Sequence, residues 1–136
     1  MLKVALTGSI AVGKNYVLEI FRELGCHTID ADQIARDVVK PCLPAYHEIV
    51  REFGVEVLTS DGTIDRAKLG SLVFTDSDKR ERLNRIVHPR VIEQINRLVS
   101  EIERGDPHGV VVVSAALFVE SGAHRNFDKL IVVFCD

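Results

Sequence analysis

The sequence has 136 residues, enough for one domain with a real hydrophobic core. Apolar residues make up 46% of it, which excludes a disordered protein, and the formal net charge of −3 argues against a general nucleic-acid binder, which needs a basic face. The apolar runs are too short to span a membrane, and the three cysteines (Cys26, Cys42 and Cys135) form no paired motif. We therefore expect a cytoplasmic protein with reduced thiols, no nucleic-acid partner and no membrane contact.

The first half of the chain alternates short apolar runs with amphipathic segments. Gly8, Gly25 and Pro41 are the residues that we expect to end elements here, because glycine and proline interrupt regular structure. The predicted elements are a strand over residues 3–7, a helix over 14–24, a strand over 27–29, a helix capped by Asp30 or Asp32 and running to about residue 40, and a helix over 45–53.

The second half begins with a predicted turn at Asp61 and Gly62 and ends in two runs rich in valine. The predicted elements are a helix capped by Asp65, a helix from Asp76 or Ser77 to His88-Pro89, a helix over residues 90–104, and strands over 110–113 and 130–134. Uninterrupted β-branched runs are typical of strands buried on both faces. Strands that alternate with helices then predict an α/β fold of three layers, with a parallel sheet flanked by helices.

A phosphate-binding loop is predicted where the first strand meets the first helix. Gly8, four residues, Gly13 and Lys14 have the P-loop spacing, in the strand-to-helix context which that motif requires. Glycines let backbone N–H groups turn toward phosphate oxygens, the helix start adds its positive dipole end, and the lysine supplies an ammonium group. The alternative is an ordinary strand-to-helix turn with a solvated lysine.

Asn15 departs from the P-loop pattern. The motif has serine or threonine after the lysine, because that hydroxyl binds Mg²⁺. An asparagine carbonyl can also bind Mg²⁺, but it is longer and sits differently. We therefore expect phosphate binding to be retained, and Asn15 leaves open whether the metal is held in the usual place.

Two carboxylates, Asp30 and Asp32, follow the second predicted strand. Ligands of open α/β sheets bind at the carboxyl ends of strands, so both side chains could face the phosphate site. A carboxylate there can accept a proton from a substrate hydroxyl or hold Mg²⁺ through water. Helix capping is the alternative, and it would account for one of the two.

A longer set of short motifs then indicates a family. They are Ala5-Leu-Thr-Gly, Asp30-Ala-Asp-x-Ile-Ala-Arg36, Phe53-Gly54, Asp61-Gly-Thr-Ile-x-Arg66-x-x-Leu69, Val73-Phe74, Leu83-Asn84, His88-Pro89 and Leu117-Phe-Val-Glu120. In this order and spacing the chain resembles the dephospho-coenzyme A kinases. The resemblance runs from residue 1 to the end, and it is far more specific than the P-loop alone.

The resemblance implies transfer of the γ-phosphoryl group of ATP, with Mg²⁺ as cofactor, to the 3′-hydroxyl of dephospho-CoA. Asp32 and Lys14 would be catalytic, with Asp32 the base near the attacking hydroxyl, and Asn15 and Asp32 would hold the metal. The ATP-binding residues would be Gly8, Ala11, Val12, Gly13, Lys14, Asn15 and Tyr16. The acceptor side would be formed by Asp30, Arg36, His88 and Glu120.

Three of these acceptor-side residues also have a simpler interpretation. Arg36 could be a solvated residue on a polar helix face. His88, which precedes Pro89, could end a helix inside the core. Glu120 could cap the turn around Gly122.

The expected organisation is a single P-loop kinase domain over residues 1–136. It would contain a helical acceptor-binding insertion at roughly residues 31–104 and would lack the C-terminal lid region that family members carry. Ser9, Ser114 and Ala116 stand where the family commonly has glycine, an acidic residue and proline. Two hypotheses follow: a dephospho-CoA kinase seen as a truncated chain, or a non-catalytic nucleotide-binding protein of the same fold. The oligomeric state stays open.

Overall fold

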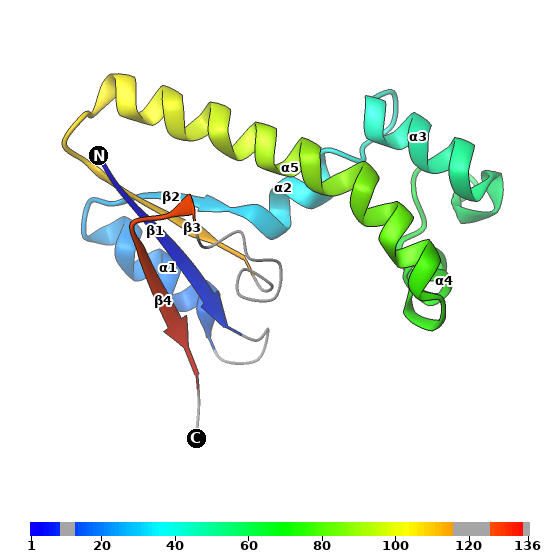
Figure 1. The fold of residues 1–136 in the computed structure, drawn as a ribbon, viewed down its shortest axis with the longest axis horizontal. Helices are drawn as coiled ribbons and strands as arrows, with labels where there is room; N and C mark the ends of the chain where they lie inside the picture. Colours follow the sequence, from blue (N-terminus) through cyan, green and yellow to red (C-terminus); the bar gives the residue numbers. More distant parts are fainter. Residues whose placement is uncertain (9–12, 116–125, 135–136) are drawn as a thin grey trace. The chain divides into compact units, whose positions relative to one another are not determined.

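The computed structural model describes residues 1–8, 13–115 and 126–134 (Figure 1). They form two compact units: Met1–Asp32 with Ile95–Asp136, here called the sheet unit, and Gln33–Gln94, here called the helical unit. The helical unit lies inside the segment that was expected to form an acceptor-binding insertion. No helix in the described ranges is both long enough and apolar enough to cross a membrane.

The sheet unit is built on a parallel four-stranded sheet with the strand order β2-β3-β1-β4. The strands are β1 (Leu2–Gly8), β2 (His27–Asp30), β3 (Val110–Ser114) and β4 (Lys129–Val133). Each pairing between neighbours is parallel. The four predicted strands and the parallel sheet are therefore confirmed. The third strand in the chain, β3, lies between β1 and β2 in the sheet.

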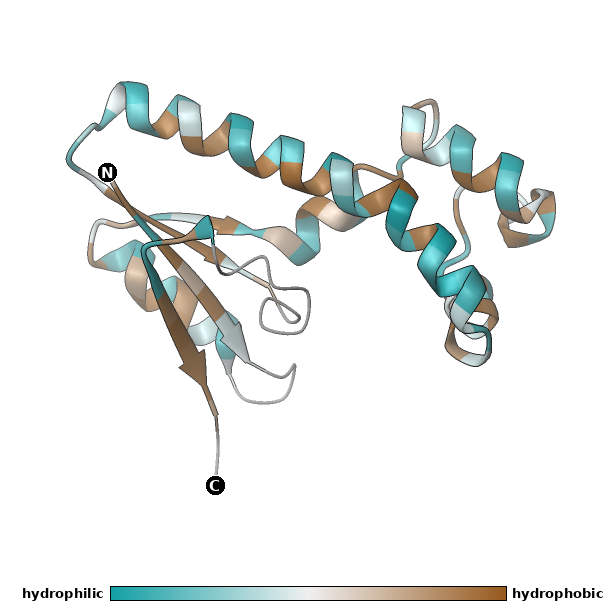
Figure 2. Ribbon diagram, viewed as in Figure 1, coloured by the Kyte–Doolittle hydropathy of each residue, from teal (hydrophilic) through white to brown (hydrophobic). Residues whose placement is uncertain are grey.

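One face of the sheet packs on helix α1 (Lys14–Glu23). Its core consists of Val4, Leu6, Leu18 and Val112, with Val17, Phe21, Cys26, Val110, Ile131 and Val133 packed around it. Figure 2 shows the strands as largely hydrophobic, whereas the helices alternate between hydrophilic and hydrophobic residues. This contrast agrees with the predicted pattern of a sheet that is covered by amphipathic helices.

The alternate residues of the same strands form the other face. Ala5, Val111 and Val113 are fully buried there. In the same unit, the C-terminal part of helix α5 (Ser77–Gly105) buries Ile95 and Val99. The valine run of β3 is thus buried on both sides, as its composition predicts.

The helical unit has a second, separate core. Its helices are the end of α2 (Ala31–Asp37), α3 (Pro44–Phe53), the 3₁₀ helix η2 (Val55–Val57), α4 (Arg66–Thr75) and the first part of α5. Ile49, Val57 and Leu69 are buried at its centre. Leu83, Ile86 and Val87 of α5 pack against this cluster. The predicted helix capped by Asp30 or Asp32 does form, but it ends at Asp37, earlier than expected.

Helix α5 differs from the prediction. Two helices separated at His88-Pro89 were predicted, but a single helix of 29 residues runs from Ser77 to Gly105 with Pro89 inside it. Proline removes one N–H from a helix and crowds the preceding turn, which costs about 3 kcal/mol in a helix interior. The helix continues because apolar residues on both sides of Pro89 are packed: the earlier ones lie against the core of the helical unit, and Ile95 and Val99 are buried in the sheet unit.

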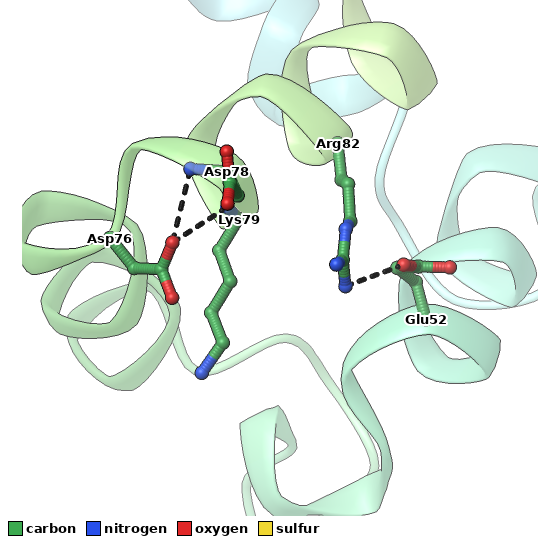
Figure 3. Close-up of polar contacts among 5 residues, drawn as sticks. All are labelled: Glu52, Asp76, Asp78, Lys79 and Arg82. Atoms are coloured by element: carbon green, nitrogen blue, oxygen red, sulfur yellow. Dashed lines mark hydrogen bonds and ion pairs between the residues drawn. The ribbon is translucent and has the colours of Figure 1, made fainter.

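Short polar side chains set the starts of α4 and α5. Asp65 accepts hydrogen bonds from the N–H groups of Ala67 and Lys68, and Asp76 accepts them from Asp78 and Lys79 (Figure 3). Both caps were predicted, and both satisfy N–H groups that a helix leaves free at its first turn.

The predicted turn at Asp61 and Gly62 is also present. Gly62 has φ 86°, a left-handed conformation that favours glycine. The hydroxyls of Thr59 and Thr63 donate to the Asp61 carboxylate and lower its pKa. The tyrosine hydroxyl of Tyr46, on α3, donates to the Gly62 carbonyl and ties this turn to the helical core.

Candidate functional site

A row of side chains lies on the α1 side of the sheet, close to the edge where the strands end. Leu6 of β1 is in register with Ser114 of β3, and Ser114 is in register with Asp30 of β2. These side chains lie on the α1 side because Thr28, two residues before Asp30, faces that helix: its Oγ1 accepts a hydrogen bond from Arg22 Nε of α1 at 3.0 Å. Residues two apart in a strand share a face. Ligands of parallel sheets bind beyond this edge.

Gly13 lies between the loop and helix α1. Its backbone has φ 81° and ψ 24°, a left-handed conformation that a residue with a Cβ adopts only under strain. It is the N-cap residue of α1, and neither a side-chain cap nor an acidic residue occupies the first turn of that helix. The positive end of the helix dipole is therefore not neutralised by the helix's own side chains, as an anion site requires. Ala11 and Val12, also predicted to bind ATP, lie outside the described residues.

Lys14 and Asp32 form an ion pair at this edge. Lys14 Nζ lies 3.0 Å from Asp32 Oδ2, and the lysine side chain is 6% exposed whereas the aspartate side chain is 46% exposed. Lys14 follows β1 and Asp32 follows β2, and β3 lies between these two strands. The pair therefore connects elements that begin beyond two non-adjacent strands. The structure thus brings a cation and a carboxylate together at this edge of the sheet.

Asp30 caps the start of helix α2. Its Oδ1 accepts a hydrogen bond from the Asp32 N–H at 3.0 Å, at the start of α2. The two carboxylates of this segment thus differ: one caps the helix that holds the other in place. Capping was the alternative weighed for one of the pair, and the structure gives it to Asp30.

The sequence as a whole decides the family. A family model described as dephospho-CoA kinase matches residues 2–136. The chain belongs to the dephospho-CoA kinase family.

Curated relatives agree with this family. A dephospho-CoA kinase from Syntrophus aciditrophicus is 46% identical over 134 residues, which are 98% of this chain and 57% of that protein. A dephospho-CoA kinase from Thermobifida fusca is 48% identical over 133 residues, 98% of this chain and 65% of that protein. The chain therefore spans less than two thirds of the length of these relatives.

Solved structures support the P-loop fold that is characteristic of the dephospho-CoA kinases. A dephospho-CoA kinase from Campylobacter jejuni matches with a TM-score of 0.76 at 30% identity, over 97% of this chain and 65% of that one. A crystal structure of a Thermus thermophilus protein matches with a TM-score of 0.77 at 25% identity, over 97% of this chain and 64% of that one. The α/β fold that the sequence predicts is confirmed.

The remaining residues predicted for a dephospho-CoA kinase site lie in several places. Asn15 and Tyr16 are exposed in the first turn of α1, next to the buried Lys14. Arg36 is exposed on α2 one helical turn after Asp32. His88 is exposed on α5 in the helical unit. Glu120 lies outside the described residues.

The available oxygen atoms suit a magnesium ion that arrives with a nucleotide. The described residues contain no group of three or more His, Cys, Asp or Glu side chains able to hold a metal. Magnesium in nucleotide sites is usually held by one or two protein oxygens together with phosphates and water. Asp32, Asn15 and the Ser114 hydroxyl are of the required kind, and the Ser114 Oγ is buried without a partner in the described chain. The residues therefore fit the metal.

Two features of this site were not predicted. The Lys14–Asp32 contact depends on the place of β3 in the sheet, which sequence order does not reveal. Ser114 was noted only as a departure from the family, whereas the structure shows it fully buried in register with Asp30. The signal for Ser114 was present in the sequence, since a polar residue ends an otherwise apolar strand at the ligand-binding edge.

Proposed function

We propose that this protein is a dephospho-CoA kinase, which transfers the γ-phosphoryl group of ATP to the 3′-hydroxyl of dephospho-CoA and yields coenzyme A and ADP. The single observation that carries the proposal is the Lys14–Asp32 contact at the carboxyl edge of the sheet, in a chain that belongs to this family. The proposal includes a cytoplasmic location, which agrees with the absence of a membrane-spanning helix in the described ranges.

Lys14 and the backbone around Gly13 would hold the phosphates of ATP. The left-handed Gly13 turns the chain into α1, and the start of that helix attracts negative charge. The ammonium of Lys14 would offset charge on the β- and γ-phosphates. Asp32 and Asn15 would hold Mg²⁺, which would supply positive charge to offset that of the phosphate oxygens.

Asp32 would act as the base. The acceptor's 3′-oxygen would form a bond to the γ-phosphorus while the bond to the β,γ-bridging oxygen breaks, and the hydroxyl proton would pass to the Asp32 carboxylate. The electron pair of the broken bond would leave with ADP. Because this reaction needs positioning and charge stabilisation more than covalent chemistry, a short set of residues is sufficient.

The acceptor would be bound by Asp30, Arg36, His88 and Glu120. Arg36 supports this role because it lies one turn from Asp32 on the same helix and is exposed. Its guanidinium suits the phosphate groups of dephospho-CoA. His88 would contribute a second polar contact from α5.

A coupled ADP-release assay with dephospho-CoA, with coenzyme A identified by mass, tests the proposal. We expect ADP release that depends on dephospho-CoA, and losses of roughly 100-fold or more in kcat/KM for Lys14→Met and Asp32→Asn. Asp106→Asn is the matched control, because Asp106 is also ion-paired, with His27, at the opposite edge of the sheet. Binding of ATP without formation of coenzyme A would reject the proposal.

A non-catalytic nucleotide-binding protein of the same fold is the second candidate. Asn15 and Ser114 favour it, because they stand where the motif has a serine or threonine hydroxyl and where the family commonly has an acidic residue. This candidate predicts ATP binding and no turnover, even after Asn15→Ser restores the hydroxyl. The same assay therefore separates the two functions.

A further inference from the structure

The Lys14–Asp32 pair joins the two groups to which the proposed reaction assigns opposite tasks. Lys14 Nζ, which should serve the nucleotide, donates to Asp32 Oδ2, which should serve the acceptor, at 3.0 Å. Asp32 is held in place through its N–H, which donates to Asp30 Oδ1. Lys14 is held by its position at the first residue of α1. In this state the lysine ammonium is not available to a phosphate, and the aspartate carboxylate is not available to a hydroxyl.

The two side chains are buried to different extents, and this decides which of them can be released when a phosphate competes with Asp32 for Lys14. The lysine side chain is 6% exposed and the aspartate 46% exposed. A buried ammonium needs a negative partner, since an unpaired charge in a poorly hydrated place is costly. A half-exposed carboxylate can instead return to water at small cost. A phosphate group that approaches Lys14 therefore competes for the lysine, and the aspartate is the group that can be released.

We propose that Lys14 and Asp32 form a latch that the nucleotide opens: phosphate takes over Lys14, and the Asp32 carboxylate then becomes available to the acceptor hydroxyl. Only the second part of this inference, the release of Asp32 to the acceptor, rests on the proposed function. Its consequence is an order of binding, in which the acceptor binds tightly after the nucleotide has bound.

The nucleotide half is tested by the affinity for ADP and ATP in EDTA, where the metal cannot contribute. We expect Asp32→Asn to tighten binding by roughly 3- to 10-fold, because phosphate then has no carboxylate to displace. Asp106→Asn removes the same charge at the opposite edge and should leave the affinity unchanged within about twofold. Lys14→Met should abolish measurable binding. Thermal melts of each variant establish that it is folded.

Unchanged or weaker nucleotide binding by Asp32→Asn overturns the latch. Equal tightening by Asp32→Asn and Asp106→Asn overturns it as well, because the effect would then come from net charge. These outcomes do not depend on the identity of the acceptor. They stand even if the protein proves not to phosphorylate dephospho-CoA.

The acceptor half is tested by the affinity for dephospho-CoA with and without saturating ADP. We expect ADP to tighten it by about 5-fold or more in the wild type, and this coupling to be lost in Asp32→Asn. An affinity of the wild type for dephospho-CoA that is the same with and without ADP overturns the binding order. Absence of any dephospho-CoA binding rejects the proposed function instead, and the nucleotide titration alone then decides the latch.

Discussion

Ser114 is the last residue of β3, and its hydroxyl is fully buried with no hydrogen-bond partner in the described part of the chain. An orphaned hydroxyl contributes little to folding, since its loss of hydration is not offset. Its neighbours in register are Leu6 and Asp30. At the ligand-binding edge of the sheet, such a group is better explained as a contact for something bound there.

Ser114→Ala should therefore leave the free energy of unfolding of the ligand-free protein unchanged, or raise it by up to about 1 kcal/mol. The same change should reduce the gain in ATP affinity that Mg²⁺ provides, because no hydroxyl is then available to the metal or its water. Chemical denaturation and ATP titrations with and without Mg²⁺ measure the two effects.

Ser71→Ala serves as the comparison for that experiment. Ser71 donates to the Ala67 carbonyl on an exposed face of α4, so its replacement should not alter the effect of Mg²⁺. A loss of more than about 1 kcal/mol of stability in Ser114→Ala would show that the hydroxyl is structural, and would contradict the prediction.

At the residue scale, the sequence predicted which side chains lie near the site better than how they are partnered. Lys14, Asp30 and Asp32 were all placed at the strand ends by motif and spacing. Their contacts with one another follow from tertiary structure: Asp30 caps α2, and Asp32 meets Lys14 across the end of β3. Neither fact is encoded in a local pattern.

At the scale of elements, two ion pairs join α3 to α5 inside the helical unit. Glu52 pairs with Arg82 at 3.1 Å (Figure 3), and Glu48 pairs with Arg90 at 2.9 Å. The two differ in exposure, since the side chain of Arg82 is 53% exposed and that of Arg90 is 28% exposed. Exposed pairs contribute little to stability, whereas loss of one partner leaves a more buried charge uncompensated.

We therefore predict that Glu48→Ala lowers the free energy of unfolding by roughly 1–3 kcal/mol and Glu52→Ala by less than about 1 kcal/mol. Both residues lie on α3, so the helix propensity gained is the same in the two variants. Urea denaturation of the two proteins measures the difference. Equal losses would contradict the prediction.

Elements were predicted well where the signal was local. The valine run of β3, the caps Asp65 and Asp76, and the stop at Gly25 were all confirmed. The break at Pro89 was wrong. Proline is a strong local signal, but burial of apolar residues on both sides of it outweighs its cost, and that burial depends on contacts far away in the sequence.

At the scale of the whole molecule, strand β4 forms an edge of the described sheet, and one side of it is apolar and exposed. Leu130 is 38% exposed and Val132 51%, whereas Ile131 and Val133 pack toward α1. An apolar edge strand is a site for association between copies of a chain.

Val132→Lys should reduce concentration-dependent self-association of the 136-residue chain while changing its stability by no more than about 0.5 kcal/mol. Light scattering across a concentration series measures the first effect and thermal melting the second. Ile131→Lys, which places the same charge in the core, should unfold the protein. Self-association that is unaffected by Val132→Lys would exclude this edge as the contact.

The central position of β3 has a consequence for how the protein is made. In the described sheet β1 pairs with β3 and β4, and β2 pairs with β3, so neither early strand has a partner until residue 110 has been synthesised. The helical unit, Gln33–Gln94, is by then complete and continuous in sequence. We expect it to fold first during translation, with the candidate site at the strand ends assembling late, when the ribosome has released β3.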